Sequence, residues 1–140
     1  MKARRKMHGC LKAFLVGLGA MVVFVLLLRW LLLDSVWKAE SICRGLHLGM
    51  NVLEVDPILH AQVHAQGYRL RCVYQVGVAG DWKDVTQAEF ADALKAHKPD
   101  APQEFRVWVQ VFGAFAPASF IIGADGTGRV VDISHPRTRG

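Results

Sequence analysis

Residues 13–33 read AFLVGLGAMVVFVLLLRWLLL, and this stretch decides how the chain is organised. It contains 20 uncharged residues and one arginine, so a helix built from it has no polar face. At about 1.5 Å per residue such a helix spans roughly 31 Å, the thickness of the hydrocarbon core of a bilayer. We therefore predict a transmembrane helix at residues 13–33.

Arg29 is the charged residue in this helix, and it lies close to the end that Asp34 marks. Its stem can follow the helix while the guanidinium reaches the membrane surface. Trp30 and Trp37 are typical of the same interfacial layer. We interpret Arg29 as a residue that reaches the interface, rather than as a functional charge within the membrane.

A cleaved signal peptide is the main alternative to a permanent helix. Such peptides have an apolar region of about 7–15 residues followed by small residues at the cleavage site. The apolar run here is longer, and residues 31–41, LLLDSVWKAES, offer no such site. Cys10 precedes the run and Cys43 follows Ile42, so neither cysteine suits lipoprotein processing. We expect an uncleaved anchor.

The charge distribution gives the orientation. The chain has a net charge of +5, and five of its 17 basic residues lie in residues 1–12, which contain no acid. Apart from Arg29, the other 11 basic residues lie in residues 34–140 together with all 12 acidic residues, so that region is nearly neutral and nucleic-acid binding is not expected. The positive-inside rule predicts a cytoplasmic tail at 1–12 and an exported domain at 34–140. The expected location is the inner (cytoplasmic) membrane, single-pass, with the C-terminal domain periplasmic or otherwise extracytoplasmic.

The exported region begins with helix signals. Asp34 or Ser35 can cap a helix that runs to about Leu46, either separate from the membrane helix or continuous with it. A second helix is expected to end near residue 66, where Gly67 is a natural stop. Two starts are compatible with the sequence: one at Asn51, which has capping-box spacing with Glu54, and one at residue 56 followed by a proline in the first helical position.

Residues 68–134 carry signals for four strands and one further helix. Thr86 and Glu89 have the spacing of a capping box, which predicts a helix at residues 86–97. We expect Gly80-Asp81-Trp82 to form a loop and residues 98–103 a linker. Alternating apolar residues and the turn at residues 125–128 predict strands at 68–78, 105–112, 119–124 and 129–134. Together these elements predict an α+β domain, with helices packed on an antiparallel sheet of three or four strands.

Residues 46–59, LHLGMNVLEVDPIL, resemble the repeated signature of the SmpA/BamE-like fold. In that family an apolar residue leads into Gly-Met-Thr and a helix. Gly49 and Met50 match the family residues, Asn51 replaces the threonine, and Val55 and Leu59 fall at the expected helical places. Tyr74 suits the family's Tyr-containing strand, and the closing hairpin of the family is matched by Phe120, Asp125, Gly128 and Val130.

The chain also departs from the family pattern. His60-Ala61-Gln62 stands where the family usually has Gly-x-Pro, and the helix at 86–97 resembles an insertion. The best-known family member is a lipoprotein of the outer-membrane β-barrel assembly machine, whereas this chain has a transmembrane segment. The resemblance implies a domain that binds protein or lipid, and it does not identify the partner.

Cys43 and Cys72 are candidates for a disulfide bond. Both lie in the exported region, where an oxidising compartment favours pairing. They fall on a helix and a strand that pack together in the resembled fold. The alternative is two buried free thiols, and Cys10 is expected to stay reduced in the cytoplasm.

Motifs for chemistry are weak in this sequence. His60 and His64 share one helix face at a spacing that can bind zinc, but no third ligand has a recognisable spacing, so we expect no metal and no cofactor. None of the exported serines lies in a Gly-x-Ser-x-Gly motif; these are Ser35, Ser41, Ser119 and Ser134. We therefore expect a protein that is not an enzyme, and we identify no small-molecule substrate.

Two tryptophans suggest a binding surface instead. Trp82 lies in the expected loop, and Trp108 falls on the polar side of its strand, beside Arg106 and Gln110. Exposed tryptophans are favoured anchors in interfaces, and the alternative is that both pack under the helix at 86–97. These four residues are our candidate partner-binding residues.

The sequence thus predicts a non-enzymatic, membrane-anchored module of the cell envelope. It would dock onto a larger membrane or envelope protein assembly. An immunity or inhibitor protein against a secreted toxin or hydrolase is the alternative, and a small envelope hydrolase is a weaker one.

Overall fold

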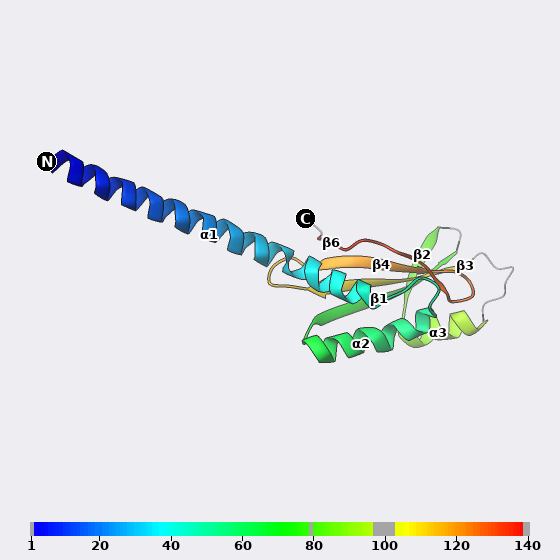
Figure 1. Ribbon diagram of the computed structural model, residues 1–140. Helices are drawn as coiled ribbons and strands as arrows, with labels where there is room; N and C mark the ends of the chain where they lie inside the picture. Colours follow the sequence, from blue (N-terminus) through cyan, green and yellow to red (C-terminus); the bar gives the residue numbers. More distant parts are fainter. Residues whose placement is uncertain (1, 79, 97–102, 139–140) are drawn as a thin grey trace.

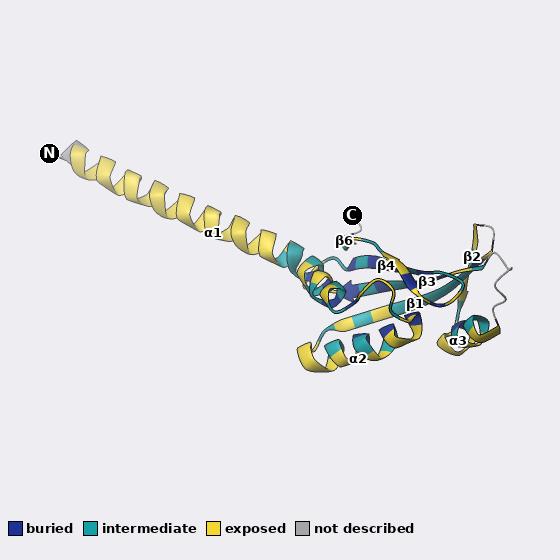
Figure 2. Cartoon of the chain, turned by 45° about the vertical axis from the view of Figure 1, so that its right-hand side comes forward, coloured by how far each residue is buried: buried dark blue, intermediate teal, exposed yellow. Residues whose placement is uncertain are grey.

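The computed structural model describes residues 2–78, 80–96 and 103–138. Its first element is α1 (Lys2–Arg44), one uninterrupted helix of 43 residues that projects from the rest of the chain (Figure 1). The helix is long and apolar enough to cross a membrane. Its N-terminal part is exposed, and one side of its last turns is buried against the domain (Figure 2). The second of our two alternatives, continuity with the membrane helix, is therefore confirmed, and Asp34 and Ser35 do not begin a helix.

Residues 51–67 form the second helical region. A 3-10 turn, η1 (Val52–Glu54), leads directly into α2 (Val55–Gln66). The side chain of Asn51 accepts a hydrogen bond from the Leu53 N–H at 3.0 Å, so Asn51 caps the 3-10 turn rather than the α-helix. Gly67 ends α2 with φ = 67°, and its N–H donates to the Val63 carbonyl at 2.8 Å. The predicted end of this helix is confirmed.

The described residues form a six-stranded antiparallel sheet. Its order is β2-β1-β3-β4-β5, with β6 also paired to β4. Our expectation of three or four strands is too low, because Asp81–Val85 is a strand rather than part of a loop and because residues 137–138 form a short edge strand. The strands are β1 (Arg69–Val78), β2 (Asp81–Val85), β3 (Gln103–Phe112), β4 (Ala118–Ala124), β5 (Val130–Ile133) and β6 (Arg137–Thr138).

The helix between β2 and β3 is α3 (Gln87–Ala96). Its capping box is confirmed: the Glu89 N–H donates to Thr86 Oγ1 at 3.2 Å, and the Thr86 N–H donates to Glu89 Oε2 at 3.4 Å. The expected helix end at His97 and most of the expected linker lie outside the described residues. Gln103, which we assigned to the linker, is the first residue of β3.

One face of the sheet carries the core. On β3, residues 105, 107, 109 and 111 are buried and alternate with partly exposed residues. The buried side chains pack against residues from all three helices, including Ile42 of α1, Leu59 of α2 and Phe90 of α3. The Phe90 ring meets the Phe105 ring edge-on, with centroids 5.6 Å apart. The fold is therefore α+β, with the helices on one side of the sheet (Figures 1 and 2).

Backbone hydrogen bonds join the two separate parts of the family-like motif, residues 49–52 and residues 128–130. The Gly49 N–H donates to the Val130 carbonyl at 2.7 Å, and the Val130 N–H donates to the Met50 carbonyl at 2.8 Å. The Val52 N–H donates to the Gly128 carbonyl at 2.7 Å. Gly49 and Gly128 both have positive φ, near 85°, which a side chain would disfavour. The core contains the other motif residues, Val55, Leu59 and Phe120, together with Val130.

Candidate functional site

The second face of the sheet presents the residues that alternate with the core. Directly opposed residues of paired strands point to the same side, so the strand register defines this surface. Arg106 lies opposite Gln75 on β1, and Trp108 lies between Val73 of β1 and Ile121 of β4. We call this surface, which also includes Trp82 and Gln110, the open face.

Trp82 is held on the open face from two sides. It lies opposite Gly77 in the β1–β2 pair, and a Cβ added at Gly77 would come within 2.8 Å of the Trp82 ring. The ring therefore lies directly over the β1 backbone. From the other side, the guanidinium carbon of Arg106 lies 3.9 Å from the ring centre, in cation–π geometry.

A polar ladder fixes Arg106 in this position. Its Nε donates a hydrogen bond to the side-chain oxygen of Gln75. The Gln75 amide in turn donates to Asp84 Oδ1 at 2.6 Å. Strands β3, β1 and β2 are thereby linked by side chains as well as by backbone bonds, which holds the Arg106–Trp82 pair in a defined geometry.

Two shallow cavities flank Ile121 on this side of the molecule. One, of about 520 Å³, is lined by Trp82, Arg106 and Asp132 among others. The other, of about 470 Å³, is lined by Trp108, Ser134 and Arg137 among others. Both include Ile121, whose side chain is partly exposed between them. A partner side chain entering either cavity would meet an aromatic wall and a guanidinium.

The four predicted binding residues therefore lie on one surface. Arg106, Trp108 and Gln110 alternate along β3, all partly exposed, and Trp82 contacts Arg106 across β1. The expected position of Trp82 in a loop is wrong, because its backbone pairs with β1. Trp82 packs over Gly77 and beneath Arg106 rather than under α3.

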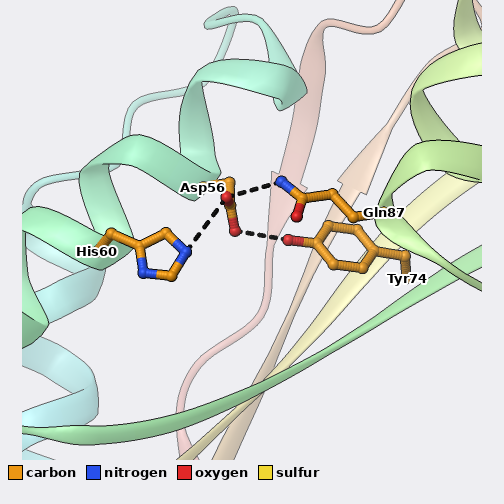
Figure 3. Close-up of polar contacts among 4 residues, drawn as sticks. All are labelled: Asp56, His60, Tyr74 and Gln87. Carbon is orange, nitrogen blue, oxygen red and sulfur yellow. Dashed lines mark hydrogen bonds and ion pairs between the residues drawn. The ribbon is translucent and has the colours of Figure 1, made fainter.

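A second polar cluster, which the sequence did not reveal, surrounds Asp56 (Figure 3). Tyr74 on β1 donates its hydroxyl to Asp56 Oδ1 at 2.6 Å, and the Gln87 amide at the start of α3 donates to Oδ2 at 2.7 Å. His60 Nε2 lies 3.4 Å from the same Oδ2. The sequence indicates only a helix cap at Asp56, because no local pattern links it to Tyr74 or Gln87, which are 18 and 31 residues away.

The Asp56 cluster borders a cavity of about 500 Å³ that Leu59 and Cys72 also line. Burial, the hydrogen bond to Asp56 and its negative charge raise the pKa of Tyr74 above its ordinary value. Burial, with a smaller effect of Asp56, raises the pKa of the Cys72 thiol to about 11. Cys72 is thus held as a neutral thiol, which is a poor nucleophile. The contacts of the cluster hold α2, β1 and α3 together, which is a structural role.

The cysteine and histidine candidates are placed as follows. Cys43 and Cys72 are free, half-buried thiols that both pack against the core, and Cys10 is exposed on α1. The Cys43–Cys72 bridge remains a prediction for the oxidised protein. His60 and His64 are both exposed on α2. Within the described ranges, no three His, Cys, Asp or Glu side chains are grouped so that they could hold a metal ion.

Comparison of the chain with models of protein families, with curated proteins and with solved structures finds no match.

Proposed function

We propose that this chain is a non-enzymatic, membrane-anchored binding module of the cell envelope, whose open face docks onto a larger membrane or envelope protein. The observation that carries the proposal is the fixed Arg106–Trp82 pair, which lies on the same surface as Trp108. Tryptophan and arginine are the residues most enriched among interface hot spots. A geometry held in advance reduces the entropy that binding costs.

Anchoring supports the same proposal. Residues 13–33 anchor the domain in the inner membrane of a bacterium with two membranes. The basic tail then lies in the cytoplasm, and residues 34–140 lie on the outer side of that membrane. Confinement to one surface raises the effective concentration for a partner in or near that membrane. A reporter active only outside the cytoplasm, fused after Gly140, should be active; activity of only a cytoplasmic reporter would contradict this orientation.

We also propose that the domain is SmpA/BamE-like. The hydrogen bonds that join residues 49–52 to residues 128–130 support this, because they connect the two separate parts of the resembled signature. The extra helix α3 and the edge strands β2 and β6 are then additions to the resembled fold.

Photo-crosslinking in the cells that produce the protein tests the docking proposal. A photoactivatable phenylalanine analogue at Trp108 or at Gln110 should give a discrete product of higher mass, from which the partner is identified. The same residue placed at His64, exposed on α2, is the matched control. Equal products from position 64, or none from positions 108 and 110, would contradict docking by the open face.

A further inference from the structure

The loop between β3 and β4 contacts α1 at the point where the apolar run ends. Asp34 Oδ2 accepts a hydrogen bond from the Ala114 N–H at 3.2 Å. Gly113 lies against Ser35, because a Cβ added there would come within 2.7 Å of the Ser35 backbone nitrogen. The loop is therefore fixed at the level of residues 34–35, one residue beyond Leu33. Figure 1 shows it at the end of the domain from which α1 projects.

This loop exposes aromatic side chains. Phe115 is 61% exposed, and Phe112, at the end of β3, is 39% exposed. Trp37 is exposed on α1 within one turn of the Asp34–Ala114 contact. Large aromatic residues are favoured at the boundary between lipid chains and water, where an apolar ring is costly to leave in solvent.

Charge on the open face changes sign along the strands. Near the loop, Arg69 lies opposite Phe112, and Arg71 lies in a row with Gln110, Ser119 and Arg137. Toward the other end of the strands, three acidic residues, Asp84, Glu104 and Asp132, outnumber the single cation Arg106 on this face. The basic end is thus the end that the β3–β4 loop places next to the membrane.

A cavity of about 610 Å³ lies at the same end. Lys38, Tyr68, Arg69 and Phe112 line it, together with residues of the loop. Asp34 also lines it and forms an ion pair with Lys38 at 2.8 Å, so Arg69 supplies the uncompensated positive charge of the lining. The size and the basic and aromatic walls suit a phospholipid headgroup.

We propose that the domain has a second membrane contact, a rim formed by Phe112, Phe115, Arg69, Arg71 and Arg137. Phe115 enters the interfacial layer of the leaflet from which α1 emerges, and the three arginines contact lipid phosphates. The contact limits the tilt of the domain and so presents the open face at a fixed height. This inference rests on the proposed anchoring by residues 13–33 and is independent of the identity of the protein partner.

The test uses the full chain reconstituted into vesicles of phosphatidylglycerol and phosphatidylcholine. Phe115→Cys is made in a Cys10→Ser background and labelled with an environment-sensitive fluorophore, and Ala114→Cys provides a second position in the loop. Val131→Cys, an exposed position of β5 at the opposite end of the sheet, is the matched control. The Cys10→Ser parent measures labelling of Cys43 and Cys72.

We expect the probe at 115 to emit at shorter wavelength than the probe at 131, and to be quenched several-fold more strongly by lipids that carry a shallow quencher. Replacing Arg69, Arg71 and Arg137 with glutamine should reduce that quenching in phosphatidylglycerol vesicles and change it little in pure phosphatidylcholine. A chain that floats with vesicles while both loop probes behave like the probe at 131 would overturn the rim. A chain that does not float with vesicles would overturn the anchor, and with it the rim.

Discussion

The guanidinium of Arg106 on β3 lies over the ring of Trp82 on β2, although β1 separates these two strands. Contact across an intervening strand is possible here because Gly77 has no side chain, so the indole lies flat over β1. The pair joins the outer strand of the sheet to its centre. It also places an aromatic ring and a cation side by side on the face that we propose for docking.

The Arg106–Trp82 contact should contribute measurably to stability. A double-mutant cycle with Arg106→Ala and Trp82→Leu should give a coupling free energy of about 0.5–1 kcal/mol, the range for a partly exposed cation–π pair. Chemical unfolding of the full chain in detergent micelles provides the values. Lys83→Ala, on exposed β2, should show no coupling with Trp82→Leu. A coupling free energy of zero between Arg106→Ala and Trp82→Leu would contradict the contact.

The packing of α1 against the β3–β4 loop predicts different outcomes for two glycines. Gly113→Ala should destabilise the domain by about 1–3 kcal/mol, because its Cβ would meet the Ser35 backbone rather than a flexible side chain. Gly123→Ala should be nearly neutral, because its nearest contact would be at 3.7 Å. Similar unfolding free energies for the two variants would show that the loop does not pack on α1 as described.

Tyr74→Phe removes the 2.6 Å hydrogen bond to Asp56 and should cost roughly 1–2 kcal/mol at neutral pH. It should also change the response to alkali. The folded state raises the pKa of Tyr74, so the contribution of Tyr74 is fully present below about pH 10 and is lost as pH rises toward the folded value. Unfolding measured above pH 10 should therefore show a steeper loss of stability in the parent chain than in Tyr74→Phe. Parallel losses would contradict this.

Signals that are local in sequence predicted the structure well. The Thr86–Glu89 capping box, the stop at Gly67 and the alternation along β3 each depend on neighbouring residues, and each is confirmed. Strand β2 was missed because Asp81–Val85 is short and charged, and it is extended only through its pairing with β1. Strand β6 has two residues, too few for any periodic pattern.

Part of the candidate site could also be predicted from local signals. Alternation along β3 places Arg106, Trp108 and Gln110 on the polar side, and the structure agrees. The contact of Trp82 with Arg106 depends on strand order, and the Asp56 cluster joins residues 18 and 31 positions apart. Neither follows from local sequence, because the first contact requires β1 to lie between β2 and β3, and the cluster forms only when α2, β1 and α3 pack together.

The proposed export of residues 34–140 leads to a prediction about the cysteines. If Cys43 and Cys72 pair in the oxidised chain, as we predict, alkylation under denaturing, non-reducing conditions should modify Cys10 alone. The bridge would close a loop of about 30 residues and stabilise the domain by roughly 3–4 kcal/mol on the chain-entropy model. In the reduced native chain, Cys72 should react far more slowly than exposed Cys10 at pH 8, because its pKa is about 11. Three modified thiols in the oxidised chain would contradict the bridge.

The affinity of the Trp108→Ala chain for the partner identified by cross-linking tests the central claim most directly. A tryptophan anchor is worth about 2 kcal/mol or more, so the variant should bind on the order of thirtyfold more weakly while circular dichroism shows an unchanged fold. Gln62→Ala on α2, away from the open face, should bind like the parent chain. A folded Trp108→Ala chain with undiminished affinity would contradict the proposal that this membrane-anchored domain binds its partner through the open face.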